Sequence, residues 1–202
     1  MKINLYEGDL PENIQLSNCI AVDSETMGLN PKRDKLCLIQ LSNGDGICHL
    51  VKIDLKVKKP HNLIRILKNN KINKIFHFAR FDVAALASNL NIHVNPIFCT
   101  KIASKIGRTY SPRHGLKEVV METVGIELDK QAQSSDWGKV GDLTQKQLIY
   151  AANDVRYLLG AKQKLEEMLK REDRWELANK CFQCVPTFSE LDRRRFTNIF
   201  DH

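Results

Sequence analysis

The segment Cys19–Thr26 reads CIAVDSET, and it decides the fold class and the first candidate site residues. Its apolar start is typical of a central strand, and the polar residues after Val22 indicate that the strand emerges at an open edge of the core. Side chains two positions apart leave one face of a strand, so Asp23 and Glu25 can hold one cation between them. Taken alone, such a pair is more often two solvated carboxylates at a strand end.

The neighbouring segments predict a mixed sheet flanked by helices, which is an α/β fold. Apolar runs at 36–41 and 47–53 are separated by the turn cluster Ser42–Gly46, and this pattern predicts a β-hairpin and three antiparallel strands. A helix over 61–69 leads to a strand over 74–78, which a helix over 80–90 follows. Strand, helix and strand in this order predict a right-handed crossover with parallel pairing.

The second half of the chain is expected to be mostly helical. A short strand is expected over 97–100, and helices over 80–90, 101–106, 115–124, 144–171 and 173–184. Thr144 and Gln147 match a capping box at the start of the long helix, and Pro186 is expected to close the last one. Because no repeat or flexible linker interrupts the pattern, residues 1–202 are expected to form a single domain.

Composition favours a nucleic-acid partner. The 31 Lys and Arg residues against 24 Asp and Glu residues give a formal net charge of +7, which attracts polyanions, although a basic protein without such a partner is the alternative. The chain start lacks the apolar core of a secretory signal, and no stretch reaches the roughly 18 apolar residues of a membrane span, so no membrane contact is expected. The six cysteines lie mostly in apolar runs and indicate reduced thiols in the cytoplasm. Cys181 and Cys184 form a lone C-x-x-C without two further zinc ligands nearby.

Two later segments supply further candidate site residues. Asp82 lies two residues into the helix expected over 80–90, and Tyr150 and Asp154 are four residues apart on one face of the long helix. Each has an ordinary structural explanation, because a carboxylate near a helix N-terminus complements the helix dipole and a Tyr packs against a core. Their order is distinctive: D-x-E on a first strand, D opening a helix after a later strand, and Y-x-x-x-D on a final long helix.

With these motifs the chain resembles the DEDDy 3′-5′ exonucleases of the RNase H-like fold, in the ribonuclease D family. The matching stretches are residues 22–26, 76–82 and 143–155. Within that family it is most similar to the short alphaproteobacterial nano-RNase C enzymes, which are oligoribonuclease-like. The supporting stretches are residues 99–105, 113–118 and 133–137. Like that group, the chain is expected to lack the C-terminal HRDC-type helical domains of full-length ribonuclease D, which argues against long structured RNA substrates.

The resemblance implies metal-dependent phosphodiester hydrolysis. Two divalent cations, Mg²⁺ or Mn²⁺, about 4 Å apart stabilise charge on the attacking and leaving oxygens, and such hard cations select oxygen ligands. Asp23 is expected to bridge both ions. Glu25 and Asp154 are expected to complete the first site, and Asp82 to support the second through water. Tyr150 is expected to orient the attacking water. Its reference pKa of about 10 disfavours loss of its own proton at neutral pH, so the metal is expected to be the stronger activator of the water.

Four apolar or aromatic residues near the acids are candidate substrate contacts. Met27 and Leu29 follow the first acidic pair and are expected to wedge between the terminal bases, with loop packing as the alternative. His77 and Phe81 flank Asp82 and are expected to contact the terminal nucleotide. A buried His bonded to the backbone is the alternative for His77.

A basic group is suited to a 5′ phosphate. Arg113, His114 and Lys117 lie before and within the helix expected over 115–124, and a solvated face is the alternative. Trp137 is expected to brace the segment that enters the catalytic helix.

The resemblance also implies the substrate and the assembly. The expected substrate is short single-stranded RNA, dinucleotides above all, cleaved to nucleoside 5′-monophosphates, and the residues do not separate RNA from DNA. A homo-oligomer, in the form of a ring-shaped octamer, is expected, with an assembly surface made by Trp175, Phe182, Phe188, Phe196 and Phe200.

Three alternatives stay open. The first is a general RNA/DNA 3′-5′ exonuclease of the same fold, and the second is a catalytically inactive nucleic-acid-binding module, against which the complete acid set with Tyr150 argues. The third is a metal-independent RNA-binding protein, which loss of activity with a chelator would exclude.

Overall fold

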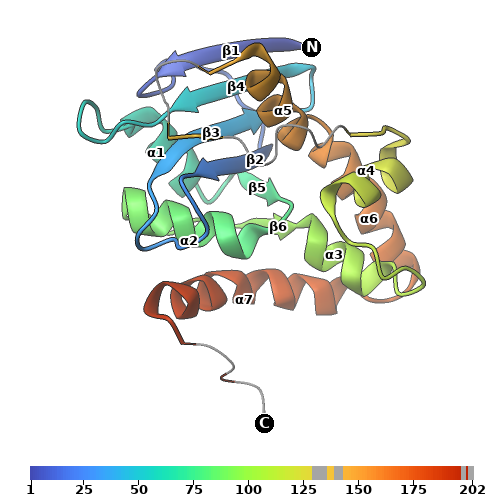
Figure 1. Ribbon diagram of the computed structural model, residues 1–202. Coiled ribbons are helices and arrows are strands. Elements are labelled where there is room, and N and C mark those ends of the chain that lie inside the picture. Colours follow the sequence, from blue (N-terminus) through green and yellow to red (C-terminus); the bar gives the residue numbers. More distant parts are fainter. Residues whose placement is uncertain (129–135, 139–142, 197–198, 200–202) are drawn as a thin grey trace.

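The computed structural model shows a six-stranded mixed sheet with helices packed on both faces, as the sequence predicts (Figure 1). It describes residues 1–128, 136–138, 143–196 and 199, so residues 133–135 and Phe200, named above, lie outside the described residues. The strands are β1 (Lys2–Glu7), β2 (Cys19–Thr26), β3 (Leu36–Ser42), β4 (Ile47–Lys52), β5 (Asn73–Phe76) and β6 (Ile97–Cys99). The helices are α1 (His61–Lys68), α2 (Ala79–Leu90), α3 (Thr100–Gly107), α4 (Leu116–Val124), α5 (Gln145–Arg156), α6 (Leu158–Arg171) and α7 (Trp175–Arg194).

The sheet has the order β1-β4-β3-β2-β5-β6. The predicted antiparallel pairing of β2, β3 and β4 is confirmed, and so is the parallel pairing that the crossover implies, between β5 and β2. Strand β1 was not predicted; it pairs parallel with β4, and the alternation of Ile3 and Leu5 with polar neighbours is the signal for it. Within the described residues no helix is long and apolar enough to cross a membrane.

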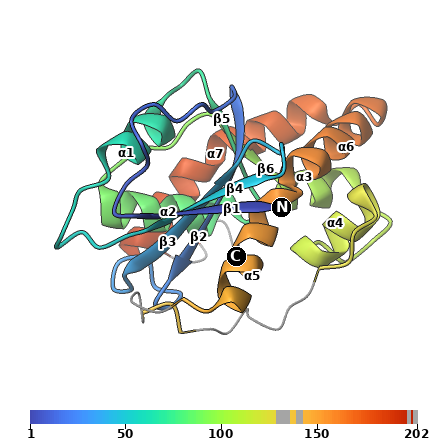
Figure 2. The ribbon, with the colours of Figure 1, turned by 90° about the horizontal axis from the view of Figure 1, so that it is seen from above.

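The two faces of the sheet at strand β2 are packed differently. Directly paired residues share a face, and Asp23 pairs with Gln40 while Glu25 pairs with Leu38. Helix α5 packs on this face, where Leu38 lies in a small apolar cluster with Ala151. The opposite face carries the main core beneath α1 and α2, and Figure 2 shows α5 and α1 on opposite sides of the sheet.

The predicted single helix over 144–171 is wrong, because the segment breaks at Tyr157, whose φ and ψ are −106° and −2°. The two halves have different packing partners: α5 contacts β2, β3 and β4, whereas α6 packs on α3 and α4. The capping box is confirmed. The Gln147 backbone N–H donates to Thr144 Oγ1 at 3.3 Å, and the Thr144 N–H donates to Gln147 Oε1 at 2.9 Å.

Helix α7 packs along α2 and continues through Pro186, so the prediction that Pro186 ends the last helix is wrong. Tertiary contacts hold the helix on both sides of the proline, because Val185 and Ser189 are buried. The Ser189 hydroxyl donates to the Arg80 carbonyl at 2.9 Å, and the Arg80 guanidinium makes two 2.6 Å bonds to Asp192.

The predicted assembly surface is wrong for Phe182, which is 2% exposed and packs against Phe98 with ring centroids 4.7 Å apart. Trp175 is partly buried, and its ring centroid lies 6.4 Å from that of Phe98. Phe188 is partly buried, and Phe196 is 54% exposed.

Candidate active site

Three carboxylates meet where α5 crosses β2. Asp23, Glu25 and Asp154 each offer one oxygen, and these oxygens all lie within 4.8 Å of one another. All three side chains are partly buried. Oxygen-only donors suit hard divalent cations such as Mg²⁺ and Mn²⁺. Among the residues that the structure describes, no other His, Cys, Asp and Glu side chains gather in this way, and the C-x-x-C pair on α7 is two free thiols.

Asp82 reaches the same strand end from the opposite face of the sheet. It lies on the first turn of α2, is only 3% exposed, and accepts a 2.7 Å hydrogen bond from the hydroxyl of Ser24. Ser24 stands between Asp23 and Glu25 and points the other way. The end of β2 is therefore bordered by acids on both faces.

Burial raises the pKa values of all four acids, and repulsion between the carboxylates raises those of Asp23, Glu25 and Asp154 further. Burial, then the charges of Asp154 and Asp82, raise the pKa of Glu25 to about 9. Burial raises the pKa of Asp82 to about 7, against the hydrogen bond from Ser24, and raises that of Asp154 to about 7 as well. Burial, followed by the charge of Asp82, raises the pKa of Asp23 well above its ordinary range. Ionised together these groups repel one another, and a cation among them would remove that cost.

Tyr150 stands beside this cluster. An interaction between its hydroxyl and the Asp154 carboxylate lowers the pKa of Asp154, whereas burial and the Asp154 charge raise the pKa of Tyr150 above its ordinary value. The phenol therefore keeps its proton at neutral pH. Trp137 is buried with its ring centroid 6.3 Å from that of Tyr150, so it packs against α5.

Gln40 is a neighbour of the acids that sequence reasoning missed. It is fully buried on β3, opposite Asp23, and its Nε2 donates to Glu25 Oε1 at 3.5 Å. Its signal in the sequence is a single polar residue inside the apolar run 36–41.

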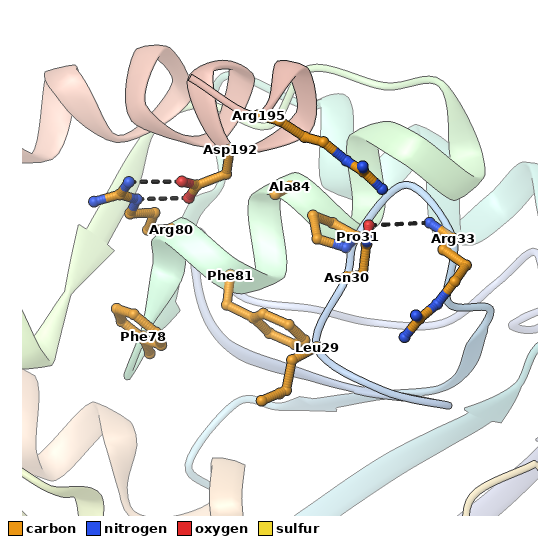
Figure 3. Close-up of a pocket in the computed structure, with 10 residues that line it drawn as sticks. All are labelled: Leu29, Asn30, Pro31, Arg33, Phe78, Arg80, Phe81, Ala84, Asp192 and Arg195. Carbon is orange, nitrogen blue, oxygen red and sulfur yellow. Dashed lines mark hydrogen bonds and ion pairs between the residues drawn. The ribbon is translucent and has the colours of Figure 1, made fainter. Parts of the chain in front are cut away.

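The structure separates the two expected wedge residues. Leu29 is 85% exposed and lines a hollow of about 490 Å³ together with Phe81 (Figure 3). Met27 is 57% exposed and lines a different hollow, beside Gly138. Leu29 and Phe81 are thus brought together, and Met27 is not.

His77 is held by a side-chain hydrogen bond, and the backbone of His114 also interacts with it, which raises its pKa against the effect of burial. Its Nδ1 lies 2.9 Å from Thr100 Oγ1, and its Nε2 is buried without a hydrogen-bond partner among the described residues. Burial lowers the pKa of His77 to about 3, so the ring is neutral.

The expected basic group is only partly available to a ligand. Arg113 is exposed, but His114 Nδ1 lies 2.9 Å from Ser104 Oγ and Lys117 Nζ lies 3.1 Å from a Glu127 carboxylate oxygen. Of the three, Arg113 is the residue most open to solvent.

A mixed sheet whose second strand carries two acids, with a third acid on a helix after a later strand and a fourth on a late helix, defines a nuclease of the RNase H-like fold. The chain belongs to the 3′-5′ exonuclease family, whose sequence model matches residues 7–170. The predicted likeness to ribonuclease D is confirmed by ribonuclease D from Serratia proteamaculans, which is 32% identical over 189 residues, or 90% of this chain and 49% of that protein. The chain thus spans about half the length of the curated relatives it matches.

Solved structures give the same relationship. NrnC from Brucella melitensis bound to pGG superposes with a TM-score of 0.93 at 47% identity, over 100% of this chain and 99% of that one. The same protein with bound Mg²⁺ gives a TM-score of 0.92 at 46% identity, over 100% of both chains. Escherichia coli RNase D gives a TM-score of 0.73 at 26% identity, over 86% of this chain and 45% of that one.

Proposed function

We propose that this chain is a metal-dependent 3′-5′ exoribonuclease that hydrolyses short RNA oligonucleotides, dinucleotides above all, to nucleoside 5′-monophosphates. The observation that carries the proposal is the meeting of Asp23, Glu25 and Asp154 oxygens within 4.8 Å, in a chain of the 3′-5′ exonuclease family. The similar Brucella protein has been solved with pGG, a 5′-phosphorylated dinucleotide, and with Mg²⁺, which supports this substrate class and a divalent ion.

The acids are the proposed metal ligands. Asp23 would be shared by two ions, Glu25 and Asp154 would complete the first site, and Asp82 would support the second through water. Two Mg²⁺ or Mn²⁺ ions held there would supply an activated water and neutralise charge on the phosphate. The raised pKa values support this assignment, because the bare cluster lacks the positive charge that four carboxylates require.

Tyr150 is proposed to orient the attacking water through its hydroxyl. Its raised pKa supports a role as a protonated hydrogen-bonding group beside Asp154. Leu29 and Phe81 are proposed to contact the terminal nucleotide, since they share one hollow. Arg113 is the proposed contact for a 5′ phosphate.

A cleavage time course tests the function. The wild-type chain is incubated with 5′-labelled RNAs of two, five and twenty nucleotides and with the matching DNAs, in Mg²⁺, Mn²⁺ or EDTA. Metal-dependent cleavage concentrated on the RNA dinucleotide is expected. Equal processing of long RNA or DNA would instead establish a general exonuclease, and no cleavage of any substrate would reject the enzyme.

The proposal places the enzyme in the cytoplasm as a homo-oligomer. Exposed apolar side chains on and after α7, Leu177 at 57% and Phe196 at 54%, support an assembly surface there. Sedimentation at micromolar concentration tests it, and a monomer would reject it.

A further inference from the structure

The side chain of Phe78 is exposed next to the acids without a structural reason for its exposure. It is the N-cap residue of α2, where Ser, Thr, Asp or Asn is preferred because their side chains can bond the first free N–H groups. Phe78 makes no such bond, and its ring is 48% exposed. A single exposed apolar side chain is ordinary, but Phe78 lines a hollow together with Leu29 and Phe81, and such a group of apolar side chains can mark a ligand site.

The position of Phe78 relates it to the proposed active site. Residues three and four apart on a helix face the same side, so Phe78 lies on the side of α2 that carries Phe81 and Asp82, and the Phe81 N–H donates to the Phe78 carbonyl at 2.9 Å. Phe78 lines the same hollow as Leu29 and Phe81. Figure 3 shows these three side chains away from α7, whereas Asp192 and Arg195 lie beside it.

One face of the Phe78 ring is next to positive charge. Lys101 Nζ lies 4.3 Å from the ring centroid, and Lys101 and Lys105, four residues apart on α3, line a second hollow of about 230 Å³ with Phe78. In the described part of the chain, neither ammonium group has a carboxylate partner. Phe78 therefore lines two hollows, one with Leu29 and Phe81 and one with the two lysines.

We propose that Phe78 is a base-stacking residue, against whose free face the base of a substrate nucleotide lies, in the hollow that Leu29 and Phe81 also line. Proteins bind single-stranded nucleic acid by combining aromatic rings for the bases with cations for the backbone, and Phe78 with Lys101 and Lys105 is such a combination. The hollow of about 490 Å³ is large enough for a nucleotide. This inference rests on the proposed function and adds a binding residue to it.

The test compares Phe78→Ala with wild type on three substrates: the intact RNA dinucleotide, and two dinucleotides in which either the 5′ or the 3′ base is replaced by an abasic sugar. On the intact dinucleotide Phe78→Ala is expected to raise KM about tenfold with kcat changed less than threefold, because stacking contributes on the order of one decade of binding. On one abasic substrate this penalty is expected to disappear, since the base that stacks is missing. The exposed Val57, at 82%, lies outside both hollows, so Val57→Ala is the control and should match wild type on all three.

A second variant separates stacking from folding. Phe78→Trp is expected to retain wild-type KM, and its fluorescence, corrected for wild type, should be quenched by the dinucleotide in EDTA, where no turnover occurs. A penalty of Phe78→Ala that persists on both abasic substrates, or no penalty with the wild-type enzyme active, overturns the inference and leaves the proposed function standing. A changed sedimentation coefficient of Phe78→Ala without a change in KM also overturns it, because Phe78 would then face a second copy of the chain. An inactive wild type rejects the proposed function itself.

Discussion

Two clusters of buried charge in the described part of the chain are built in opposite ways. Around Arg108, whose side chain is 1% exposed, charge meets a partner: its Nη1 donates to Ser104 Oγ and to the Arg113 carbonyl, each at 2.8 Å, and its Nη2 pairs with Glu122. At the end of β2 like charges face one another, with Asp23 and its neighbours offering only oxygen atoms. The first cluster is complete in charge within the described residues, although Arg108 Nε has no hydrogen-bond partner there, whereas the second would need a cation from outside.

The pKa directions express this difference. The hydrogen bond from Arg108 holds the pKa of Glu122 below its ordinary value, whereas burial and repulsion raise those of Glu25 and Asp154. A carboxylate in the first cluster therefore favours its charged form in the folded chain, and one in the second favours its neutral form. Burial alone does not distinguish these two clusters; the charges around each carboxylate, and the direction of the pKa shift that they help to set, do.

The strongest test of this comparison removes one acid from the incomplete cluster. We expect Asp23→Asn to lower dinucleotide hydrolysis by at least about 10³-fold, because a proposed shared ligand is lost. In EDTA the same variant should unfold at a higher temperature than wild type, because one of four repelling carboxylates is gone. Glu167→Gln, which removes an exposed ion-paired carboxylate, is the control for both measurements. Activity of Asp23→Asn within tenfold of wild type would contradict the assignment.

The complete cluster should respond in the opposite direction. We expect Arg108→Met to lower the free energy of unfolding by about 3 kcal/mol, because Ser104 and the Arg113 carbonyl lose a buried donor and Glu122 loses its cation. Urea unfolding measures this. Arg171→Met breaks an exposed pair with Glu172 and should change stability by less than about 0.5 kcal/mol. Equal effects of the two variants would show that the burial of Arg108 does not affect the free energy of unfolding.

Removing the Tyr150 hydroxyl should lower turnover but leave metal binding by the four carboxylates unchanged. We expect Tyr150→Phe to lower kcat about 10²-fold, the usual range for a group that assists proton transfer. The rise in unfolding temperature on adding Mg²⁺ should stay as in wild type, since all four carboxylates remain. Tyr157→Phe, at the break between α5 and α6, is the matched control and should turn over normally. Near-normal turnover of Tyr150→Phe would reject its role.

The smallest expected effect is a pH dependence of the metal-free protein. Because the pKa of Asp82 and Asp154 is raised to about 7 and that of Glu25 to about 9, the folded chain binds more protons than the unfolded chain above about pH 4. In EDTA the contribution of these groups to stability should therefore fall as pH rises from 5 to 8. Mg²⁺ should stabilise more at pH 8 than at pH 5, and Glu25→Gln should flatten the EDTA profile. A flat wild-type profile, measured by thermal unfolding, would contradict the raised pKa values.

The sequence predicted the elements whose signal is local. The apolar run before Asp23, the turn cluster at 42–46 and the capping box at Thr144 each depend on a few adjacent residues, and the structure has them where expected. Strand and helix periodicity predicted that Asp23 and Glu25 share one face and that Tyr150 and Asp154 share another. The resemblance to the DEDDy exonucleases implied that the acids come together, and Asp23, Glu25 and Asp154 do meet.

The features that were missed depend on contacts between distant segments. The helical pattern continues unchanged across Tyr157, so only the different partners of α5 and α6 reveal the break. Pro186 signals an end to a helix, and buried neighbours override it. Arg108 looks like a surface residue in the sequence, because its burial depends on Glu122, which lies on another helix. The role of Ser24 depends on Asp82, which is distant in the sequence and accepts a hydrogen bond from the Ser24 hydroxyl.

The positions of the four acids in the sequence also determine when the acid cluster is completed during synthesis of the chain. Residues 23 and 25 are made early, residue 82 later, and residue 154 only after every strand of the sheet. Helix α5 needs an existing sheet face on which to pack, so the fourth carboxylate cannot arrive until the ribosome has released residues 145–156 from its exit tunnel. For most of its translation, the growing chain therefore has no complete acid set near its own messenger RNA.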